Sequence, residues 1–242
     1  RLGDRHHHAA GAAHARAGAT DDGGIEVIVV DSGSSGDTAA WMAQVDGLRY
    51  HRRAGDDGGI SDVVHACNAG AALARGEFLV FLDPHAIPQP GWLEALLGTF
   101  DAHPDTGLAG AQLLSADGRL QQAGSVVFAD GSVASCGRFA SPDDPRHAYL
   151  HDVDACSGAA LAVPRALFAS LGGFDPRYAP AGCHDTDLAF AVRAAGLRVR
   201  VQPASRVLYD EGRAVAADVL ARNRALLVRK WADTLHAYPS PG

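Results

Sequence analysis

The chain has 242 residues, 47% of them hydrophobic, which is enough to bury the core of one large domain or two small ones. With 21 basic and 28 acidic residues its formal charge is −7, and no run of lysine and arginine indicates a nucleic-acid or polybasic membrane surface. The four cysteines are far apart, which argues against a zinc knuckle and against a dense disulfide framework. We expect one domain that binds no nucleic acid.

Residues 1–24 combine three consecutive histidines with a tract rich in alanine and glycine. A histidine run near a terminus is more often a solvated tail than a metal site, so we assign it no function and expect a disordered or degenerate leader. No apolar run reaches the roughly 18 residues that a membrane-spanning helix needs, so we expect no transmembrane segment. The expected location is cytoplasmic, or peripheral at the inner face of the cell membrane.

From residue 25 onward, short apolar segments alternate with helical patterns. Buried strands are predicted over residues 25–30, 78–82, 108–114 and 159–163, with a hairpin over 126–135. Helices are predicted over residues 60–75, from Pro90, over 165–171 and over 223–235. The alternation predicts an α/β fold, and the nearly continuous apolar strands favour a parallel sheet.

Acidic residues follow two of these strands. Asp31 and Asp83 come directly after a buried strand, at the sheet edge where open α/β folds bind their ligands. Asp31 lies in a loop rich in serine and glycine, where a turn-forming role is the commoner one. Asp83 and His85 lie two residues apart on the same side of the chain, which suits a divalent metal, although two ligands alone are a pattern of low specificity.

A third acidic motif lies within residues 172–196. The sequence predicts an amphipathic helix ended by Gly196, with Asp185 just before it on a loop and Asp187 in its first turn. The helix dipole keeps such a carboxylate ionised, so that it could accept a proton. Helix capping is the alternative role and, from spacing alone, the more frequent one.

Taken in order, these segments resemble the family 2 glycosyltransferases. The matching pieces are IEVIVVDSGSSGDT, NAGAALARGEFLVFLD, PQPGWLEALL, DGRLQQAG, CSGAALAVPRALFASLGGFD, HDTDLAFAVRAAG, VQPASRV and RNRALLVRKWADTL. Each piece is a weak pattern, whereas their order and spacing together are specific. The resemblance is strongest to bacterial rhamnosyl and O-antigen-type transferases.

The resemblance implies a GT-A fold over residues 25–236, a Rossmann-like three-layer α/β/α sandwich with a mixed, mostly parallel sheet, followed by a tail over 237–242. It implies transfer of a sugar, with inversion, from a nucleotide-diphosphate donor to a glycan hydroxyl in cell-surface polysaccharide synthesis. The donor would be a UDP- or dTDP-sugar, the acceptor a glycan or lipid-linked glycan, and the cofactor Mn²⁺ or Mg²⁺, with Zn²⁺ as the alternative.

The resemblance also implies roles for individual residues. Asp185 would be the catalytic base, and Asp83 with His85 would hold the metal. The nucleotide would be bound by Asp31, Ser34, Asn68 and Asp83. The acceptor side would carry Gly158, His184 and Asp187, and the segment 139–152 would border it.

Several positions depart from the family pattern. His85 replaces the second acid of the DxD motif, His184 replaces a glutamate before the base, and Tyr209 replaces a histidine. The first strand should precede residue 1, which would leave residues 5–17 as a remnant of the first helix. One hypothesis is a centre of Asp83, His85 and His184 that prefers Mn²⁺ or Zn²⁺.

These departures leave a second function open: a non-catalytic relative that binds sugars or docks a partner. A nucleotidyltransferase ranks below both, because its usual phosphate loop, rich in glycine and bearing arginine or lysine, is not visible.

Overall fold

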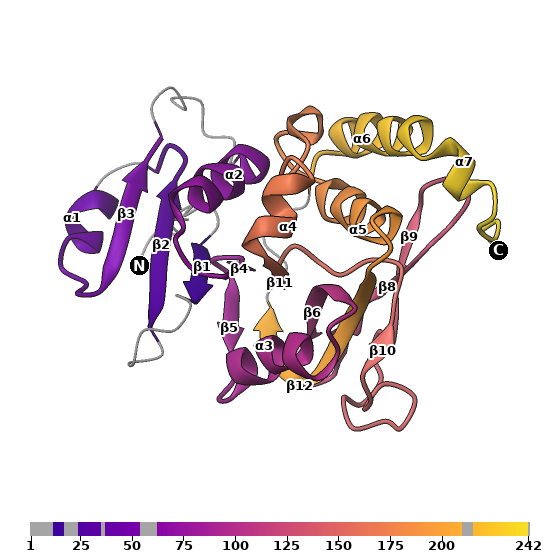
Figure 1. Cartoon of the computed structure of the whole chain (residues 1–242), viewed down its shortest axis with the longest axis horizontal. Coiled ribbons are helices and arrows are strands. Elements are labelled where there is room, and N and C mark those ends of the chain that lie inside the picture. Colours follow the sequence, from indigo (N-terminus) through magenta and orange to yellow (C-terminus); the bar gives the residue numbers. More distant parts are fainter. Residues whose placement is uncertain (1–11, 17–23, 35–36, 54–61, 210–214, 242) are drawn as a thin grey trace, which may run out of the picture.

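The computed structural model describes residues 12–16, 24–34, 37–53, 62–209 and 215–241 (Figure 1). The strands are β1 (Ala12–Arg16), β2 (Ile25–Asp31), β3 (Leu48–Arg52), β4 (Phe78–Leu82), β5 (Ala86–Pro88), β6 (Thr106–Leu114), β7 (Leu120–Gln122), β8 (Ser125–Val127), β9 (Val133–Ser135), β10 (His151–Asp152), β11 (Ala160–Pro164) and β12 (Arg198–Tyr209). The helices are α1 (Thr38–Met42), α2 (Val63–Leu73), α3 (Trp92–Ala102), α4 (Arg165–Ser170), α5 (His184–Ala194), α6 (Ala217–Lys230) and α7 (Ala232–Leu235), with a 3₁₀ turn at Pro176–Tyr178.

The main sheet has the order β10-β12-β6-β11-β4-β1-β2-β3, with β5 paired to β12 and β7 to β6. Within the described residues only β2–β3 and β6–β12 pair in parallel, so the expectation of a mostly parallel sheet was wrong. The continuous apolar strands misled that prediction. Because helices cover both faces, β11 is buried on both sides although it runs antiparallel to β4 and β6.

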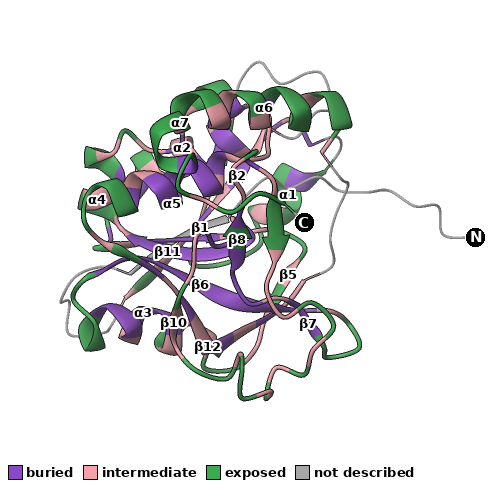
Figure 2. Ribbon diagram, turned by 90° about the vertical axis from the view of Figure 1, so that its right-hand side faces the viewer, coloured by how far each residue is buried: buried purple, intermediate pink, exposed green. Residues whose placement is uncertain are grey.

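Helices form a layer on each face of the sheet. Figure 2 shows α3 on one face and α2, α4, α5 and α6 on the other. Successive side chains of a strand point to opposite faces, and β4 shows this alternation. Val80 packs with Leu96 and Leu97 of α3, whereas Leu79 and Phe81 join the core on the opposite face. The three predicted layers are therefore present.

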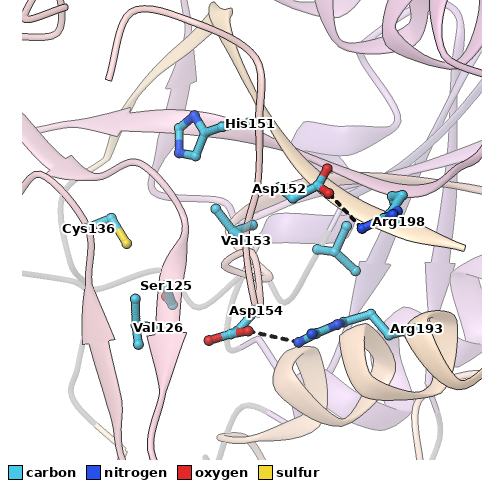
Figure 3. Close-up of a pocket in the computed structure, with 10 residues that line it drawn as sticks. Ser125, Val126, Cys136, His151, Asp152, Val153, Asp154, Arg193 and Arg198 are labelled. Carbon is cyan, nitrogen blue, oxygen red and sulfur yellow. Dashed lines mark hydrogen bonds and ion pairs between the residues drawn. The ribbon is translucent and has the colours of Figure 1, made fainter. Parts of the chain in front are cut away.

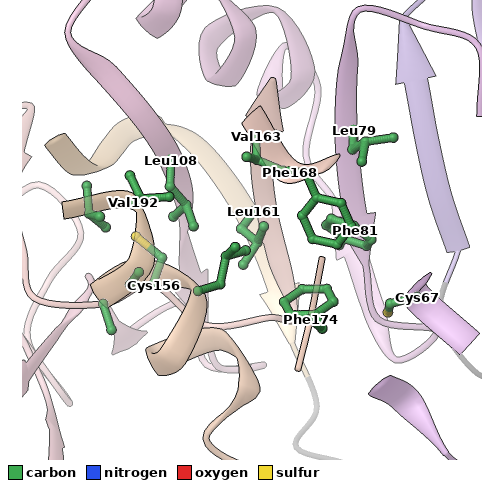
Figure 4. Packing of buried hydrophobic residues seen from close by; sticks show 14 of the residues in the cluster. Cys67, Leu79, Phe81, Leu108, Cys156, Leu161, Val163, Phe168, Phe174 and Val192 are labelled. Atoms are coloured by element: carbon green, nitrogen blue, oxygen red, sulfur yellow. The ribbon is translucent and has the colours of Figure 1, made fainter. Parts of the chain in front are cut away.

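The larger core contains three aromatic rings that join separate elements (Figure 4). Phe81 of β4, Phe168 of α4 and Phe174 lie with their ring centroids 5.0 to 5.2 Å apart. Tilted and edge-on pairs at this distance stabilise a core by roughly 0.5–1.5 kcal/mol each beyond their burial. The contacts fix the loop after α4 against the end of β4, where the acidic motifs lie.

Strand directions bring four strand ends to one edge of the sheet. β1 is antiparallel to both β2 and β4, so β2 and β4 run in the same direction. β11 is antiparallel to both β4 and β6, so β6 also runs in that direction. β12 runs parallel to β6. Asp31, Asp83, Leu114 and Tyr209 therefore end or directly follow strands at one edge, as the sequence predicted for the two aspartates.

The predicted elements from residue 60 onward largely match the structure, including β4, α2 and the β8–β9 hairpin. The helix remnant expected over residues 5–17 was wrong for residues 12–16, which form β1 between β2 and β4. The rest of the expected leader, residues 1–11 and 17–23, lies outside the described residues. β12 was not predicted as a strand, because Pro203 and a register shift between Gln202 and Arg206 interrupt its pattern.

Candidate functional site

Asp83 and His85 lie together at the end of β4. Asp83 Oδ1 accepts a hydrogen bond from the backbone N of His85 at 2.8 Å. The same oxygen lies 2.9 Å from Nδ1 of the His85 ring. Both side chains are partly exposed, 25% for Asp83 and 42% for His85. Within the described residues, no hydrogen bond reaches Asp83 Oδ2. The structure thus pairs a carboxylate with an imidazole, both accessible to a ligand.

The loop before β11 links this pair to Asp185. The backbone N of Asp83 donates to the carbonyl of Ala159 at 2.9 Å. One residue earlier, the backbone N of Gly158 donates to Asp185 Oδ2 at 3.0 Å. Adjacent Cα atoms are about 3.8 Å apart, so consecutive residues of one loop contact both acidic motifs. We call Asp83, His85, Gly158, His184 and Asp185 the strand-end site.

Asp185 is the second residue of α5, not a residue of the preceding loop as the sequence analysis expected. Its Oδ1 accepts from the backbone N of Thr186 at 2.8 Å, so it also fulfils part of the capping role. The side chain is partly exposed, whereas its neighbours His184, Thr186 and Asp187 are buried. This carboxylate is the one in the first turn of α5 that remains accessible.

His184 is 8% exposed and begins α5. Its ring packs edge-on against Phe174 with centroids 5.0 Å apart, and its buried Nδ1 has no hydrogen-bond partner within the described residues. Burial lowers the pKa of the imidazole, although Asp185 and Asp187 oppose that shift, so the ring is neutral at neutral pH. Gly158 packs closely against it: a Cβ at this position would lie 3.3 Å from His184 Nε2, so any side chain there would crowd the imidazole.

Asp31 is fully buried at the end of β2. The backbone N of Ser34 donates to Oδ1 at 2.8 Å, the hydroxyl of Tyr50 donates to Oδ2, and Arg52 lies 3.9 Å from Oδ2. Burial raises the pKa of this carboxyl, but the hydrogen bonds from Tyr50 and Ser34 outweigh burial and hold it below its usual value. The turn-forming role left open for Asp31 is therefore present, and a nucleotide-binding role stays a prediction.

Two further predicted site residues have structural contacts. The side-chain amide of Asn68 donates to the carbonyl of Phe174 at 2.7 Å and accepts from its backbone N at 2.9 Å. Asp187 is 4% exposed and accepts from Tyr178, Lys230 and Trp231. Asn68 thus holds the loop after α4, and Asp187 fastens α5 to α6 rather than facing the strand-end site.

The predicted three-ligand metal centre is not formed. No group of three or more histidine, cysteine, aspartate or glutamate side chains suited to a metal occurs among the described residues. Asp83 and His85 nevertheless offer an oxygen and a nitrogen donor side by side, a set suited to Mn²⁺ or Zn²⁺ when a substrate's phosphates and waters complete the coordination. The residues present therefore fit a metal shared with a diphosphate.

Sequence reasoning missed two contributors to this edge. Tyr50 lies on β3, a strand that was not predicted, and its role depends on the parallel pairing of Val29 with Tyr50. Phe174 was noted only within a matching segment, yet it contacts both His184 and Phe81. Tyr50 contacts Asp31 and Phe174 contacts Phe81 across separate elements, so no local pattern could have shown these two contacts.

A pocket of about 240 Å³ lies elsewhere, between the β8–β9 hairpin, β10 and the last turn of α5 (Figure 3). Its charged side chains pair with one another: Asp154 with Arg193 at 2.8 Å and Asp152 with Arg198 at 3.0 Å. Arg193 lies eight positions after Asp185 on α5, roughly 12 Å along the helix axis. The pocket is therefore distinct from the strand-end site.

Within the part of the chain that the structure describes, no helix combines the length and apolarity needed to cross a bilayer.

Comparison with known proteins gives consistent matches. The profile described as Glycosyl transferase family 2 matches residues 12–128. The O-antigen biosynthesis protein RfbC of Myxococcus xanthus is 31% identical over 160 residues, covering 63% of this chain and 12% of that protein. The chain thus spans a small part of this relative.

Two solved structures share the fold. GalNAc-T7 with UDP, GalNAc and Mn²⁺ superposes with a TM-score of 0.68 at 17% identity, covering 88% of this chain and 44% of that chain. The mannosyltransferase PcManGT of Pyrobaculum calidifontis, in complex with GDP-Man and Mn²⁺, gives a TM-score of 0.57 at 21% identity, covering 89% of this chain and 56% of that one.

Proposed function

Because this chain carries a family 2 glycosyltransferase domain with a GT-A-like fold, we propose that it moves a sugar from a nucleotide-diphosphate donor to a glycan hydroxyl with inversion. The observation that supports this most directly is the loop before β11. Within this loop, the carbonyl of Ala159 accepts a hydrogen bond from Asp83 N, and Gly158 N donates one to the carboxylate of Asp185. The residue expected to bind the sugar donor and the residue expected to accept the proton are therefore held by neighbouring residues.

In this proposal Asp185 acts as general base. Its carboxylate takes the proton from an acceptor hydroxyl as that oxygen bonds to the anomeric carbon of the donor. The bond between that carbon and the diphosphate breaks from the opposite side, and the nucleoside diphosphate leaves with the electron pair. The hydrogen bond from Gly158 N fixes the carboxylate beside the loop while leaving it partly exposed.

Asp83 and His85 would hold a divalent metal, with Mn²⁺ favoured by the donor set and by the Mn²⁺ present in both structural relatives. When bound, such a metal stabilises negative charge on a departing diphosphate. Asp83 orients His85 through its Oδ1, and the edge of the sheet keeps both side chains at the end of β4.

The acceptor would approach near Gly158, where a side chain would crowd His184 and Asp185. The likeness to an O-antigen biosynthesis protein supports a glycan or lipid-linked glycan acceptor and a role in cell-surface polysaccharide synthesis. The structural relatives carry UDP and GDP-Man, so GDP-sugars join the UDP- and dTDP-sugars to be tested.

One observation favours the alternative of a non-catalytic, sugar-binding relative. The family pattern expects a second acid where His85 stands, and among the described residues no third metal ligand joins the pair. The two functions differ in whether a bound donor is consumed.

The test measures release of nucleoside diphosphate from UDP-, dTDP- and GDP-sugars with Mn²⁺ present. Asp185→Asn should lower the rate by roughly 10²- to 10⁴-fold, the usual contribution of a general base, without weakening donor binding. Asp218→Asn is the matched control, because Asp218 is also the second residue of a helix but is exposed in α6. Full activity in Asp185→Asn would refute the assigned base. Donor binding without turnover in the folded wild type would favour the alternative.

A further inference from the structure

Asn223 is a fully buried amide in the middle of α6, the helix that lies beside α5 in Figure 1. Asparagine is a weaker helix former than the alanine, leucine and arginine residues around it. Burying its amide is unfavourable unless the polar atoms find hydrogen-bond partners. A leucine would suit both the helix and a buried position better, so the stability of α6 alone does not account for Asn223.

The amide of Asn223 binds the loop between the 3₁₀ turn and α5. Its Nδ2 donates to the carbonyls of Tyr178 at 2.7 Å, Ala181 at 2.9 Å and Gly182 at 3.1 Å. A side-chain amide has two N–H groups, so at least one of them is shared between two carbonyls. Asn223 therefore contacts both ends of a five-residue stretch of backbone, 178–182.

Two further donors complete the hydrogen bonding of this stretch. Arg222 donates to Asn223 Oδ1 from Nε at 3.1 Å and from Nη2 at 3.0 Å, which fixes the orientation of the amide. Its Nη2 also donates to the carbonyl of Ala179. From α2, the backbone N of Val64 donates to the carbonyl of Pro180 at 3.3 Å. Each of the five carbonyls thus accepts a hydrogen bond, and α6 supplies four of the five.

The loop leads directly to the first turn of α5. Gly182 is followed by Cys183, whose φ of 65° lies in the left-handed region that non-glycine residues seldom adopt. Such a conformation persists where its surroundings impose it. The bond from Asn223 to the Gly182 carbonyl fixes the peptide plane before Cys183. The plane after it is fixed by α5, because the Cys183 carbonyl accepts from Asp187 N at 2.9 Å.

The position of the Asp185 side chain depends on where α5 begins. Asp185 lies three positions after Gly182, in the first turn of the helix. Its carboxylate accepts from Gly158 N at 3.0 Å and from Thr186 N at 2.8 Å. Of these two bonds, only the first comes from another element. A displaced first turn would therefore lengthen the bond to Gly158 and move the carboxylate within the strand-end site.

We propose that Asn223 is a positioning residue for sugar transfer: through the loop that it binds, it sets the place of the Asp185 carboxylate beside Gly158. Arg222 assists by orienting the amide. The inference rests on the proposed glycosyltransferase function, because it concerns the base of that reaction. It gives α6, which contributes no residue to the strand-end site, a part in the rate of transfer. Misplacing a reacting group by about 1 Å can lower a rate by about 10²-fold, so this part is measurable.

The backbone amide signal of Gly158 in nuclear magnetic resonance spectra reports the place of the Asp185 carboxylate without turnover. Asp185→Ala removes the hydrogen bond and so marks the chemical shift of the unbonded amide. Asn223→Ala should move the Gly158 signal from its wild-type position toward that mark.

Leu96→Ala is the control for destabilisation alone. Leu96 is buried beneath α3 on the opposite face of the sheet, so its replacement should leave the Gly158 signal in place. A Gly158 signal that does not move in Asn223→Ala, or that moves equally in Leu96→Ala, would overturn the proposal.

Arg222→Met repeats the test in a variant that should fold even where Asn223→Ala does not. Arg222 is exposed, and methionine keeps most of its aliphatic length while it releases the Asn223 amide from its orienting bonds. The Gly158 signal should move in the same direction by a smaller amount. An unmoved signal in this folded variant would also refute the positioning role.

Kinetics separate a positioning role from a purely structural one. Measured per folded protein, Asn223→Ala should lower kcat for release of nucleoside diphosphate by roughly 10- to 100-fold. The KM of the sugar donor should not change, because Asn223 is not part of the strand-end site. In the Asp185→Asn background, the same substitution should cause little further loss, since both residues act through one side chain. Equal fold losses in the two backgrounds would contradict action through Asp185.

Failure of this inference is distinguishable from failure of the proposed function. If Asp185→Asn lowers turnover while Asn223→Ala changes neither the Gly158 signal nor kcat, the proposed function stands and the positioning role is wrong. If the folded wild type consumes no donor, the proposed function fails, and with it the role of Asn223 in transfer. The Gly158 signal then decides only whether α6 fixes the Asp185 side chain.

Discussion

His184 is the residue whose environment most directly couples pH to stability. Its imidazole is buried against Phe174 with an unpartnered Nδ1, and burial lowers its pKa below the ordinary 6.5. As the pH falls below 6.5, the unfolded chain takes up this proton before the folded chain does. Folding stability from this residue is therefore complete above pH 6.5 and declines below it, by up to about 1.4 kcal/mol per pH unit.

Urea unfolding at pH 7.5 and 5.5 measures this effect. The wild type should lose more stability between the two values than His184→Asn, which cannot take up the proton. An equal loss in both proteins would show that His184 does not titrate as its burial indicates.

At the scale of elements, Asp187 determines how α5 meets α6. Its Oδ1 accepts from Trp231 Nε1 at 2.7 Å and Tyr178 Oη at 3.2 Å, and its Oδ2 accepts from Lys230 Nζ at 2.8 Å. Burial, and then the charge of Asp187, raises the pKa of Tyr178, so the hydroxyl remains a donor. One buried carboxylate thus joins the 3₁₀ turn, the first turn of α5 and the end of α6.

Asp187→Ala should therefore destabilise the fold by about 2–4 kcal/mol, because it leaves the hydroxyl of Tyr178 and the indole N–H of Trp231 without their acceptor and leaves Lys230 with Asp175 alone. Asp233→Ala, at an exposed position of α7, is the control and should change stability by no more than about 0.5 kcal/mol. Chemical unfolding monitored by far-UV circular dichroism measures both. A loss in Asp187→Ala no larger than in the control would contradict the anchoring role.

Local patterns predicted individual elements well and their arrangement less well. Phe78–Leu82 was identified because a short, continuous apolar run between polar segments is typical of a buried strand. The same type of run could not distinguish a parallel from an antiparallel partner, as β11 shows. β12 escaped prediction because its pairing with β6 continues past Pro203 only through a register shift.

At the scale of the whole molecule, the sequence predicted those parts of the site that are close together along the chain. Asp83 and His85 are two residues apart, and the structure brings them into contact. The hydrogen bond from Gly158 N to Asp185 Oδ2 joins residues 27 apart, and the family resemblance had implied only their separate roles at the acceptor side and as the base. Asn68 bonds to Phe174, 106 residues away, and the sequence could not distinguish that contact from a nucleotide-binding role.

The measurement that tests the central claim most directly is calorimetric titration of UDP, dTDP and GDP into the folded chain, with Mn²⁺ and with EDTA. A donor site at the end of β4 predicts that at least one nucleotide binds with Mn²⁺ and that affinity falls at least about tenfold with EDTA or in Asp83→Ala. Asp218→Asn, at an exposed position of α6, should bind as the wild type does. Failure of all three nucleotides to bind, or binding unchanged by EDTA and by Asp83→Ala, would contradict a metal-assisted donor site at the end of β4.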